Sequence, residues 1–432
     1  MIKLILKEKV LILLIVFNMV NTIAYIIGGT LINLKYLTLF LTVLVILFSK
    51  HNNTLPIIFY LHCNSALYDD VGFSYIFNIS IGIILFKEII VYKTKLNKDS
   101  TLLVLLIFLY NLILVLFNNL FSLYGFLSMF SWTGSYFLLN IYSESKKINF
   151  NKIYLYFFVG FIMSCIYAIA IPIKMWGFNI PSAYRFIGLL RDPNYYAFDA
   201  LFLIFTARTF SKSVKKNPII YMIVISILGV LSVSKMFIIL LVFGIILYFV
   251  LNFNKLRINP YKIVLFFIIL LIITYLVYNS NFIDLIISKY SYRTGTTSIL
   301  TGRDKIQSFY ISYIFNNPLV LLFGNSTNYS AVSNIGNYLG EYFNQMVAHS
   351  TYLDLILSWG MFSSIYLYYI YKVIKKSCRK QPKKMTSDSK ILIIISILGM
   401  FSLSYLQADV FALLILYIIL ASKNRKDDEK YE

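Results

Sequence analysis

Long apolar runs recur along the whole of this 432-residue chain and limit what it can fold into. Each run, of about 17–25 residues, is long enough to cross the roughly 30 Å of hydrocarbon in a bilayer as a helix. Hydrophobic residues make up 59% of the sequence and charged residues only 13%. A membrane β-barrel would show short alternating segments instead. The sequence therefore predicts an all-α polytopic membrane protein with about 12–14 transmembrane helices.

The expected spans follow from the apolar runs and the polar residues that end them. They cover about residues 10–29, 34–49, 71–91, 101–118, 120–141, 153–173, 195–210, 217–233, 236–253, 262–279 and 350–373. The stretch 55–68 is apolar but is interrupted by His62 and Asn64, which indicates a short or half-inserted helix. The last run, 391–421, is too long for one upright helix, so two short spans are expected there.

Lysine and arginine gather in short loops at alternate ends of these runs, the positive-inside pattern that sets orientation. It predicts a protein of the cytoplasmic membrane with both termini and the basic loop 374–389 inside the cell. The loops 174–194 and 280–349 then face outward, as parts of a single integral membrane domain that covers residues 1–432. This distribution accounts for the net charge of +21 without a nucleic-acid partner.

Motifs for cofactors and for energy coupling are missing from the sequence. There is no Walker A loop, so no ATP-driven motor is predicted. The three cysteines, Cys63, Cys165 and Cys378, lie far apart and show neither a disulfide framework nor metal-binding spacing. We therefore expect no cofactor and no metal. The halves of the chain show no clear internal repeat, which argues against a secondary transporter.

The outer loop 174–194 ends in a cationic stretch at the edge of a span. Asp192 suits the N-cap of a helix and Pro193 its first turn, so a helix is predicted to begin there and to descend into the membrane. Its free N–H groups and the positive end of its dipole would bind anions on the outer side. Arg185 and Arg191 flank that end, and guanidinium groups match phosphate or pyrophosphate. Alternatively, both arginines anchor lipid headgroups.

A second outer segment begins Thr301-Gly302-Arg303-Asp304, in which the threonine and the aspartate have capping-box spacing. The residues that follow repeat at helical spacing on one face: Ile306, Phe309, Tyr310, Tyr313 and Ile314. An amphipathic helix is therefore predicted, with Arg303 at its N-terminus and its end near Asn317-Pro318. Alternatively, this helix is purely structural and its arginine is solvated.

A third segment places His349 just outside the span 350–373. Thr351 and Asp354 again have capping-box spacing. An imidazole exchanges protons near neutral pH, so His349 is either a candidate base or a polar cap of the helix.

Several carboxylates lie within or beside the apolar runs. Asp199 lies about two turns below Asp192, and Asp69, Asp70 and Asp409 are placed similarly in other runs. Intramembrane carboxylates are costly to bury and are functional candidates by default. Asp199 therefore pairs with an arginine or orients a substrate hydroxyl, or else it is a buried carboxylate satisfied by neighbouring helices.

Together these segments resemble the O-antigen ligase and polysaccharide polymerase family, the Wzy-like and WaaL-like membrane glycosyltransferases. Residues 185–194 resemble the family's R-x-x-G-x-x-x-D-P-N segment, and Ser232-Val-Ser234-Lys235 resembles its S-R/K turn between two helices. Residues 301–304 resemble its G-R element. Residues 348–353, followed by Gly360, resemble its H-N-x-Y-L…G segment. The four segments also occur in the family's order.

The resemblance covers roughly residues 160–375 and has one departure, Ser350, where the family usually has Asn. It implies a GT-C-like fold and a metal-independent transfer of lipid-linked glycan on the outer face of the membrane. The donor glycan would leave undecaprenyl pyrophosphate while a sugar hydroxyl of the acceptor attacks its anomeric carbon. A chain-length regulator is a partner implied in the same way.

The resemblance also implies roles for single residues. Arg191 and Arg303, helped by Arg185, would hold the leaving pyrophosphate. His349 would act as general base or orient the acceptor, with Asp199 as the second candidate. Supporting residues in the same motifs are Asp192, Asn194, Lys235 and Tyr352.

Three helix starts are thus expected to meet, so that Arg191, Arg303 and His349 line one outward-facing cavity. The function expected is polymerisation of lipid-linked repeat units of a capsule or O-antigen. A ligase that attaches the finished glycan shares the same motifs. The function could instead be that of a flippase or small-anion carrier. It could also be that of a cell-wall polymerase of the SEDS type, whose acidic motif we do not find in the outer loop.

Overall fold

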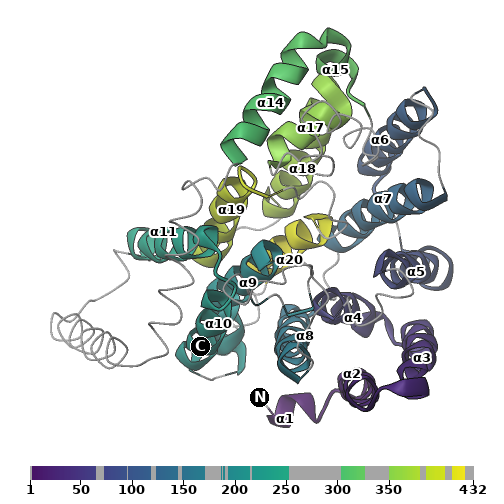
Figure 1. Cartoon of the computed structure of the whole chain (residues 1–432), viewed down its shortest axis with the longest axis vertical. Coiled ribbons are helices and arrows are strands. Elements are labelled where there is room, and N and C mark those ends of the chain that lie inside the picture. The colour runs from purple at the N-terminus through teal and green to yellow at the C-terminus, as the bar shows by residue number, and fades with distance from the viewer. Residues whose placement is uncertain are drawn as a thin grey trace.

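The computed structural model describes residues 2–64, 73–94, 96–117, 123–144, 148–170, 186, 188–189, 193–214, 217–252, 303–325, 350–379, 386–403 and 411–423. Within these residues every regular element is a helix (Figure 1). The prediction of an all-helical protein is therefore confirmed for the described part of the chain.

The helices have the following order and bounds. They are α1 (Ile2–Ile5), α2 (Lys9–Ile27), η1 (Gly29–Asn33), α3 (Leu34–Phe48), α4 (His51–Cys63), α5 (Phe73–Phe86), η3 (Lys87–Val91), α6 (Lys98–Phe117), α7 (Leu123–Glu144), α8 (Phe150–Ala170), α9 (Pro193–Val214), α10 (Pro218–Val230), α11 (Lys235–Asn252), α14 (Arg303–Asn316), α15 (Pro318–Phe323), α17 (Thr351–Trp359), η8 (Gly360–Phe362), α18 (Ser363–Arg379), α19 (Ser387–Gly399) and α20 (Phe411–Lys423). The segments η1 and η8 are 3₁₀ helices, and η3 is a π-helical turn.

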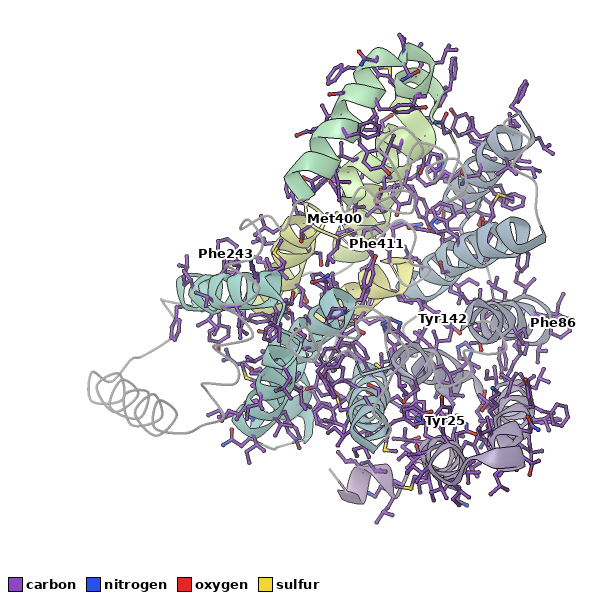
Figure 2. All side chains as sticks on the ribbon, in the orientation of Figure 1. Tyr25, Phe86, Tyr142, Phe243, Met400 and Phe411 are labelled. Atoms are coloured by element: carbon purple, nitrogen blue, oxygen red, sulfur yellow. The ribbon has the colours of Figure 1, made fainter. Side chains whose placement is uncertain are left out.

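Within the described residues, five segments are long and apolar enough to cross a membrane. They are Lys9–Ile27, Gly29–Phe48, Lys98–Phe117, Phe150–Ile169 and Thr351–Lys376. Helices α10, α11 and α20 are apolar but shorter. Large apolar side chains are exposed on the outside of the bundle, where Phe86 and Phe243 point outward (Figure 2). These features are those of a helical membrane protein. The expected span 262–279 lies outside the described residues.

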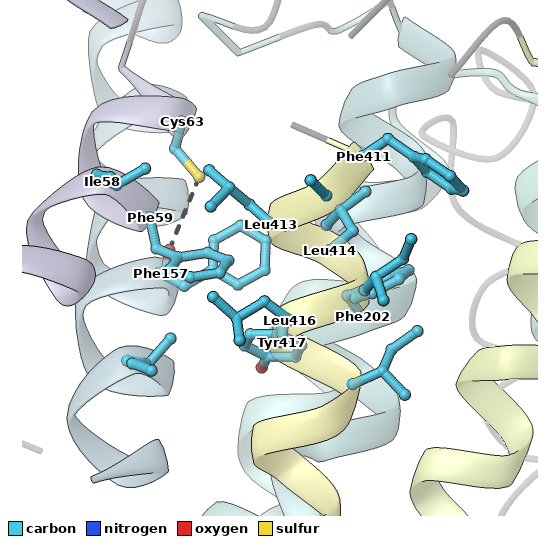
Figure 3. Packing of buried hydrophobic residues seen from close by; sticks show 14 of the residues in the cluster. Ile58, Phe59, Cys63, Phe157, Phe202, Phe411, Leu413, Leu414, Leu416 and Tyr417 are labelled. Carbon is cyan, nitrogen blue, oxygen red and sulfur yellow. Dashed lines mark hydrogen bonds between the residues drawn. The ribbon is translucent and has the colours of Figure 1, made fainter. Parts of the chain in front are cut away.

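Among the five long apolar segments of the described residues, the one in α8 is the most enclosed by other helices and the one containing α3 the least. Of the apolar window in Phe150–Ile169, 72% is buried inside the protein, against 17% for Gly29–Phe48. Around α8 lie α4, α9 and α20, whose side chains interdigitate (Figure 3). Tyr417 of α20 packs with ring centroids 5.5–5.9 Å from three phenylalanines, which are Phe59, Phe157 and Phe202.

The interrupted apolar stretch 55–68, for which a short or half-inserted helix was expected, overlaps helix α4. It has only 13 residues, and every residue from Thr54 to Cys63 is buried. A Cβ on Gly160 of α8 would lie 3.0 Å from the backbone of Tyr60, so the two helices approach closely because this residue is glycine. The prediction of a short helix is confirmed, and its surroundings are other helices.

Helices α14, α15 and α17 form a second, smaller apolar cluster at one end of the molecule (Figure 1). The helix predicted in this segment is α14, and it ends at Asn316 before Pro318 as expected. Its buried face contains Ile306, Tyr310 and Ile314, which pack against α17. The sequence predicts this buried face because its apolar residues repeat every three or four positions.

Each of the last two apolar stretches contains two helices rather than one. The run 391–421 contains α19 and α20, so the prediction of two short helices is confirmed. The expected span 350–373 divides at Gly360 (φ +56°) into α17 and α18. A Cβ on this glycine would lie 2.5 Å from the backbone of Leu322, so the break is also a close crossing with α15. Helix α18 continues to Arg379, into the segment 374–389.

Candidate functional site

The helix predicted after the cationic stretch begins at Pro193, as the sequence indicates. Asn194, in its first turn, is buried, and its amide oxygen accepts a 3.0 Å hydrogen bond from the Ser234 hydroxyl. Ser234 belongs to the turn between α10 and α11, and the next residue, Lys235, begins α11. The structure thus brings together two of the four motifs on which the family resemblance depends.

A second contact joins the same two segments. The N–H of Phe186 donates to the carbonyl of Leu231 over 3.1 Å, so backbone from the cationic stretch pairs with the turn. Val233 in this turn has a positive φ of 50°, which is strained for a β-branched residue. Strain of this kind collects at functional sites, where the surrounding structure has to hold it. Gly188 has φ +54°, and a Cβ there would lie 2.8 Å from the Ser164 hydroxyl.

Helix α17 begins at Thr351, but the predicted capping box is wrong. Its N-cap is Ser350, and no side-chain cap bond is found among the described residues. The Thr351 hydroxyl donates instead to the carbonyl of Leu403 over 2.5 Å. Asp354 is buried and faces α14, where burial together with its carboxylate raises the pKa of Tyr310 to about 12. Tertiary partners therefore replaced the local cap.

The C-terminal end of α19 connects the starts of α14 and α17. The Thr351 N–H donates to the carbonyl of Met400 over 2.8 Å, and the Tyr352 hydroxyl donates to that of Ile397 over 3.0 Å. Gln307, one turn into α14, donates its amide to the Phe401 carbonyl over 3.2 Å. Figure 2 labels Met400 at this end of α19. Residues 399–403, which we call the α19 end, are thus shared by both helices.

The α19 end also contacts the first turns of α9. A Cβ on Gly399 would lie 2.8 Å from the ring of Phe198, so this ring packs directly on the α19 end because the residue there is glycine. Phe198 lies five residues after the start of α9. The starts of α9, α14 and α17 therefore gather around the α19 end, and the start of α11 joins them through the bond between Ser234 and Asn194.

Several predicted site residues lie outside the described part of the chain. They are Arg185, Arg191, Asp192 and His349, and with them Asp69, Asp70 and Asp409. Arg303 is the first residue of α14, but only its backbone belongs to the described part. The common cavity expected for Arg191, Arg303 and His349 therefore stays a prediction, while the helices that follow these residues share one junction.

Asp199 is buried in α9, and its partner is one that sequence reasoning missed. His62 of α4 places Nε2 2.7 Å from Oδ2 of Asp199. The side chains are 9% and 4% exposed, respectively. No arginine pairs with Asp199 among the described residues. The partner seen is His62, so the alternative of a carboxylate satisfied by a neighbouring helix is the one that agrees with the structure. The signal was present, since His62 interrupts an otherwise apolar run.

Three further polar contacts involve the helices that carry this pair or the residue just after α4. The Cys165 thiol and the Tyr196 hydroxyl are 3.2 Å apart, and they join α8 to α9. Asn64, just after α4, donates its amide to the Gly160 carbonyl over 3.1 Å and accepts a 2.7 Å bond from the amide of Asn18. Buried polar groups therefore tie α4 to α2, α8 and α9.

A second buried polar cluster, also unexpected from the sequence, lies where α3, α4, α5 and α7 meet. Glu88 is fully buried and accepts hydrogen bonds from the hydroxyls of Tyr142 (2.7 Å) and Thr94 (2.8 Å). Its Oε1 lies 2.8 Å from Nδ1 of His51. The neighbouring Lys87 donates to the carbonyls of Ile46 (2.9 Å) and Ser49 (2.5 Å). This Lys87–Glu88 cluster belongs to the predicted cytoplasmic side.

Neither cluster has the composition of a metal site. In the part of the chain that the structure describes, no group of three or more His, Cys, Asp and Glu side chains could hold a metal ion.

No protein-family model matches the chain, and no curated protein matches it.

Proposed function

We propose that the protein is a membrane glycosyltransferase that polymerises oligosaccharide repeat units carried on undecaprenyl pyrophosphate. In this proposal it has about 12–14 transmembrane helices and a GT-C-like arrangement, and it lies in the cytoplasmic membrane with both termini inside the cell. The transfer takes place on the outer face, needs no metal and builds a capsule or O-antigen. A chain-length regulator is the expected protein partner.

The observation that carries the proposal is the gathering of helix starts around the α19 end. Helices α9, α14 and α17 follow directly after, or begin with, the predicted residues Arg191, Arg303 and His349. Each helix start is bound to or packed against residues 399–403. The starts of helices carry partial positive charge, so such a junction favours a phosphate group.

The chemistry assigned to this junction is charge stabilisation and deprotonation. As the bond from the anomeric carbon to the pyrophosphate breaks, negative charge develops on the leaving oxygen. Arg191 and Arg303, with Arg185 near them in sequence, neutralise that charge. His349 orients or deprotonates the acceptor hydroxyl, and Asp199 is a second candidate for contact with that hydroxyl.

Purified protein in nanodiscs, supplied with an undecaprenyl-pyrophosphate-linked repeat unit, tests the proposal. Wild-type protein should build a ladder of longer glycans, whereas Arg191→Ala and Arg303→Ala should remain inserted and leave single repeat units. Arg379→Ala, at the far end of α18, is the matched control and should leave the ladder unchanged. Long polymer in both outer-arginine variants would refute the mechanism.

The same assay separates polymerisation from ligation and from transport. A ligase would transfer finished glycan to a second acceptor and would not lengthen the lipid-linked repeats. A flippase would move them across a liposome membrane without elongation, and a small-anion carrier would be active without any glycan. Polymerisation is preferred to transport because the arginines lie in predicted outer loops and no internal repeat is seen in the sequence.

A further inference from the structure

In the pair formed by His62 and Asp199, one imidazole nitrogen makes no hydrogen bond to the described residues. Nε2 of His62 lies 2.7 Å from Oδ2 of Asp199, and both side chains are at least nine-tenths buried. The other imidazole nitrogen, Nδ1, is also buried and has no hydrogen-bond partner among the described residues. One nitrogen is therefore held by a carboxylate while the second is left without a partner. Carboxylate–imidazole pairs that move protons in enzymes have this division of roles.

The position of the pair fits exchange with the proposed transfer site. Asp199 lies six residues after Pro193, which is about 9 Å from the start of α9 at 1.5 Å per residue. Side chains in a helix lean toward its N-terminus, so that of Asp199 leans toward the junction. Tyr195 and Tyr196 lie on the same face, one turn nearer the junction. His62 comes from the last turn of α4.

The titratable groups around the pair are neutral when protonated. They are Cys63 on α4, Cys165 on α8, Tyr196 on α9 and Tyr417 on α20. These groups have partners of their own: the Cys63 thiol contacts the Phe157 carbonyl, Cys165 and Tyr196 contact each other, and Tyr417 contacts Thr206. None of the ion pairs in the described residues brings a lysine or arginine to Asp199.

The pair lies inside the bundle, where Nδ1 of His62 is the nitrogen left without a hydrogen bond among the described residues. Glycosyl transfer releases one proton for each bond formed, so a nearby buried pair of this kind has a chemical use.

We propose that His62 and Asp199 take up the proton of the attacking hydroxyl, with Nδ1 of His62 as the accepting atom. This inference rests on the proposed function. The acceptor's O–H bond breaks and its electron pair forms the new bond to the anomeric carbon. The bond from that carbon to the pyrophosphate oxygen breaks, and its electrons leave with the phosphate. The proton reaches Nδ1 through an intervening hydroxyl or water, so His62 is a positioning residue, and His349 orients the acceptor.

The His62→Gln variant separates this role from a structural one. Glutamine can still donate an N–H to Asp199 but cannot take up a proton. In the elongation assay we expect an unchanged KM for the undecaprenyl-linked repeat, a kcat lower by about 10²–10³-fold, and a rate that no longer rises with pH. His62→Leu should lose thermal stability as well. The control is His51→Gln at the other end of α4, which should keep the wild-type kcat and pH profile.

A spectroscopic readout checks the pair without reference to activity. The chain has only three histidines, so its imidazole ¹⁵N signals can be assigned with single variants in nanodiscs. Asp199→Asn should move the His62 signals and leave those of His51 and His349 in place. Unmoved His62 signals, or a His62→Gln variant with wild-type kcat and pH profile, would overturn the inference. Wild-type protein that never elongates the repeat would overturn the proposed function itself, whatever the spectra show.

Discussion

The Ser234 hydroxyl donates a 3.0 Å hydrogen bond to the amide oxygen of Asn194 across 40 residues of sequence. Both residues are buried, and each stands immediately beside a helix start, at α11 and at α9. The bond therefore fixes the distance between two positive helix ends that carry Lys235 and the cationic stretch. Its loss should disturb function more than stability.

A double-mutant cycle on Ser234→Ala and Asn194→Ala measures this coupling. Each single variant should lose about 0.5–1.5 kcal/mol of unfolding free energy, and the double variant should lose less than their sum. Elongation should fall in all three, because the two helix ends lose their fixed spacing. Thermal unfolding in detergent and the elongation assay supply the two readouts. Fully additive losses would show that the bond does not couple the two segments.

Substitution of Gly360 or Gly324 should be poorly tolerated. Each has a positive φ, and a Cβ on either would lie 2.3–2.5 Å from backbone of the opposing segment. We expect Gly360→Ala and Gly324→Ala each to lower the unfolding free energy by at least about 1–3 kcal/mol. Gly82→Ala is the control, since nothing lies within 4 Å of its Cβ and alanine favours the helix. Equal stability of all three variants would contradict the close crossing.

Thr351 should act through its hydroxyl rather than as a helix cap. Thr351→Val removes the bond to the Leu403 carbonyl while keeping the shape, and should lower the unfolding free energy by about 1–3 kcal/mol because a buried acceptor loses its donor. Thr351→Ser keeps the hydroxyl and should stay close to wild type in elongation. If valine and serine behave alike, the α19 end does not depend on this bond.

The Lys87–Glu88 cluster should be needed for folding and not for transfer. Glu88→Gln weakens the hydrogen bonds from Tyr142 and Thr94 and removes the charge beside His51, so we expect a loss of about 1–3 kcal/mol. Lys50→Gln, at an exposed site nearby, should be neutral. The molecules that remain folded should elongate at the wild-type rate. If kcat of the folded Glu88→Gln protein falls while its KM is unchanged, the cluster takes part in the reaction and the prediction is wrong.

The sequence predicts helix type and many helix ends well, because these depend on local patterns. Pro193 begins α9 because the N–H that proline lacks would be unbonded in the first turn anyway. Helix α14 ends before Pro318 because proline cannot continue the backbone hydrogen bonds of a helix. The face of α14 follows from spacing alone. These features need no knowledge of distant residues.

The residues missed are those whose partners are distant in the sequence. His62 and Asp199 are 137 positions apart, and neither neighbourhood predicts the other. Thr351 and Asp354 had the spacing of a capping box, yet Leu403 took the threonine hydroxyl. Local patterns failed here because tertiary partners competed for the same polar atoms. The predicted roles of Arg191, Arg303 and His349 remain to be tested by the elongation assay.

The burial of the residues from Thr54 to Cys63 in α4 has a consequence for biogenesis. A helix of 13 residues that contains Pro56 and two histidines is a poor substrate for insertion into lipid by itself, because it is short and its polar groups would face hydrocarbon. Its packing partners α8 and α9 are synthesised later, and Asp199 leaves the ribosome 137 residues after His62. The assembly of this protein is therefore expected to proceed through an open, incomplete bundle in which α4 takes its final place only after α8 and α9 have been synthesised.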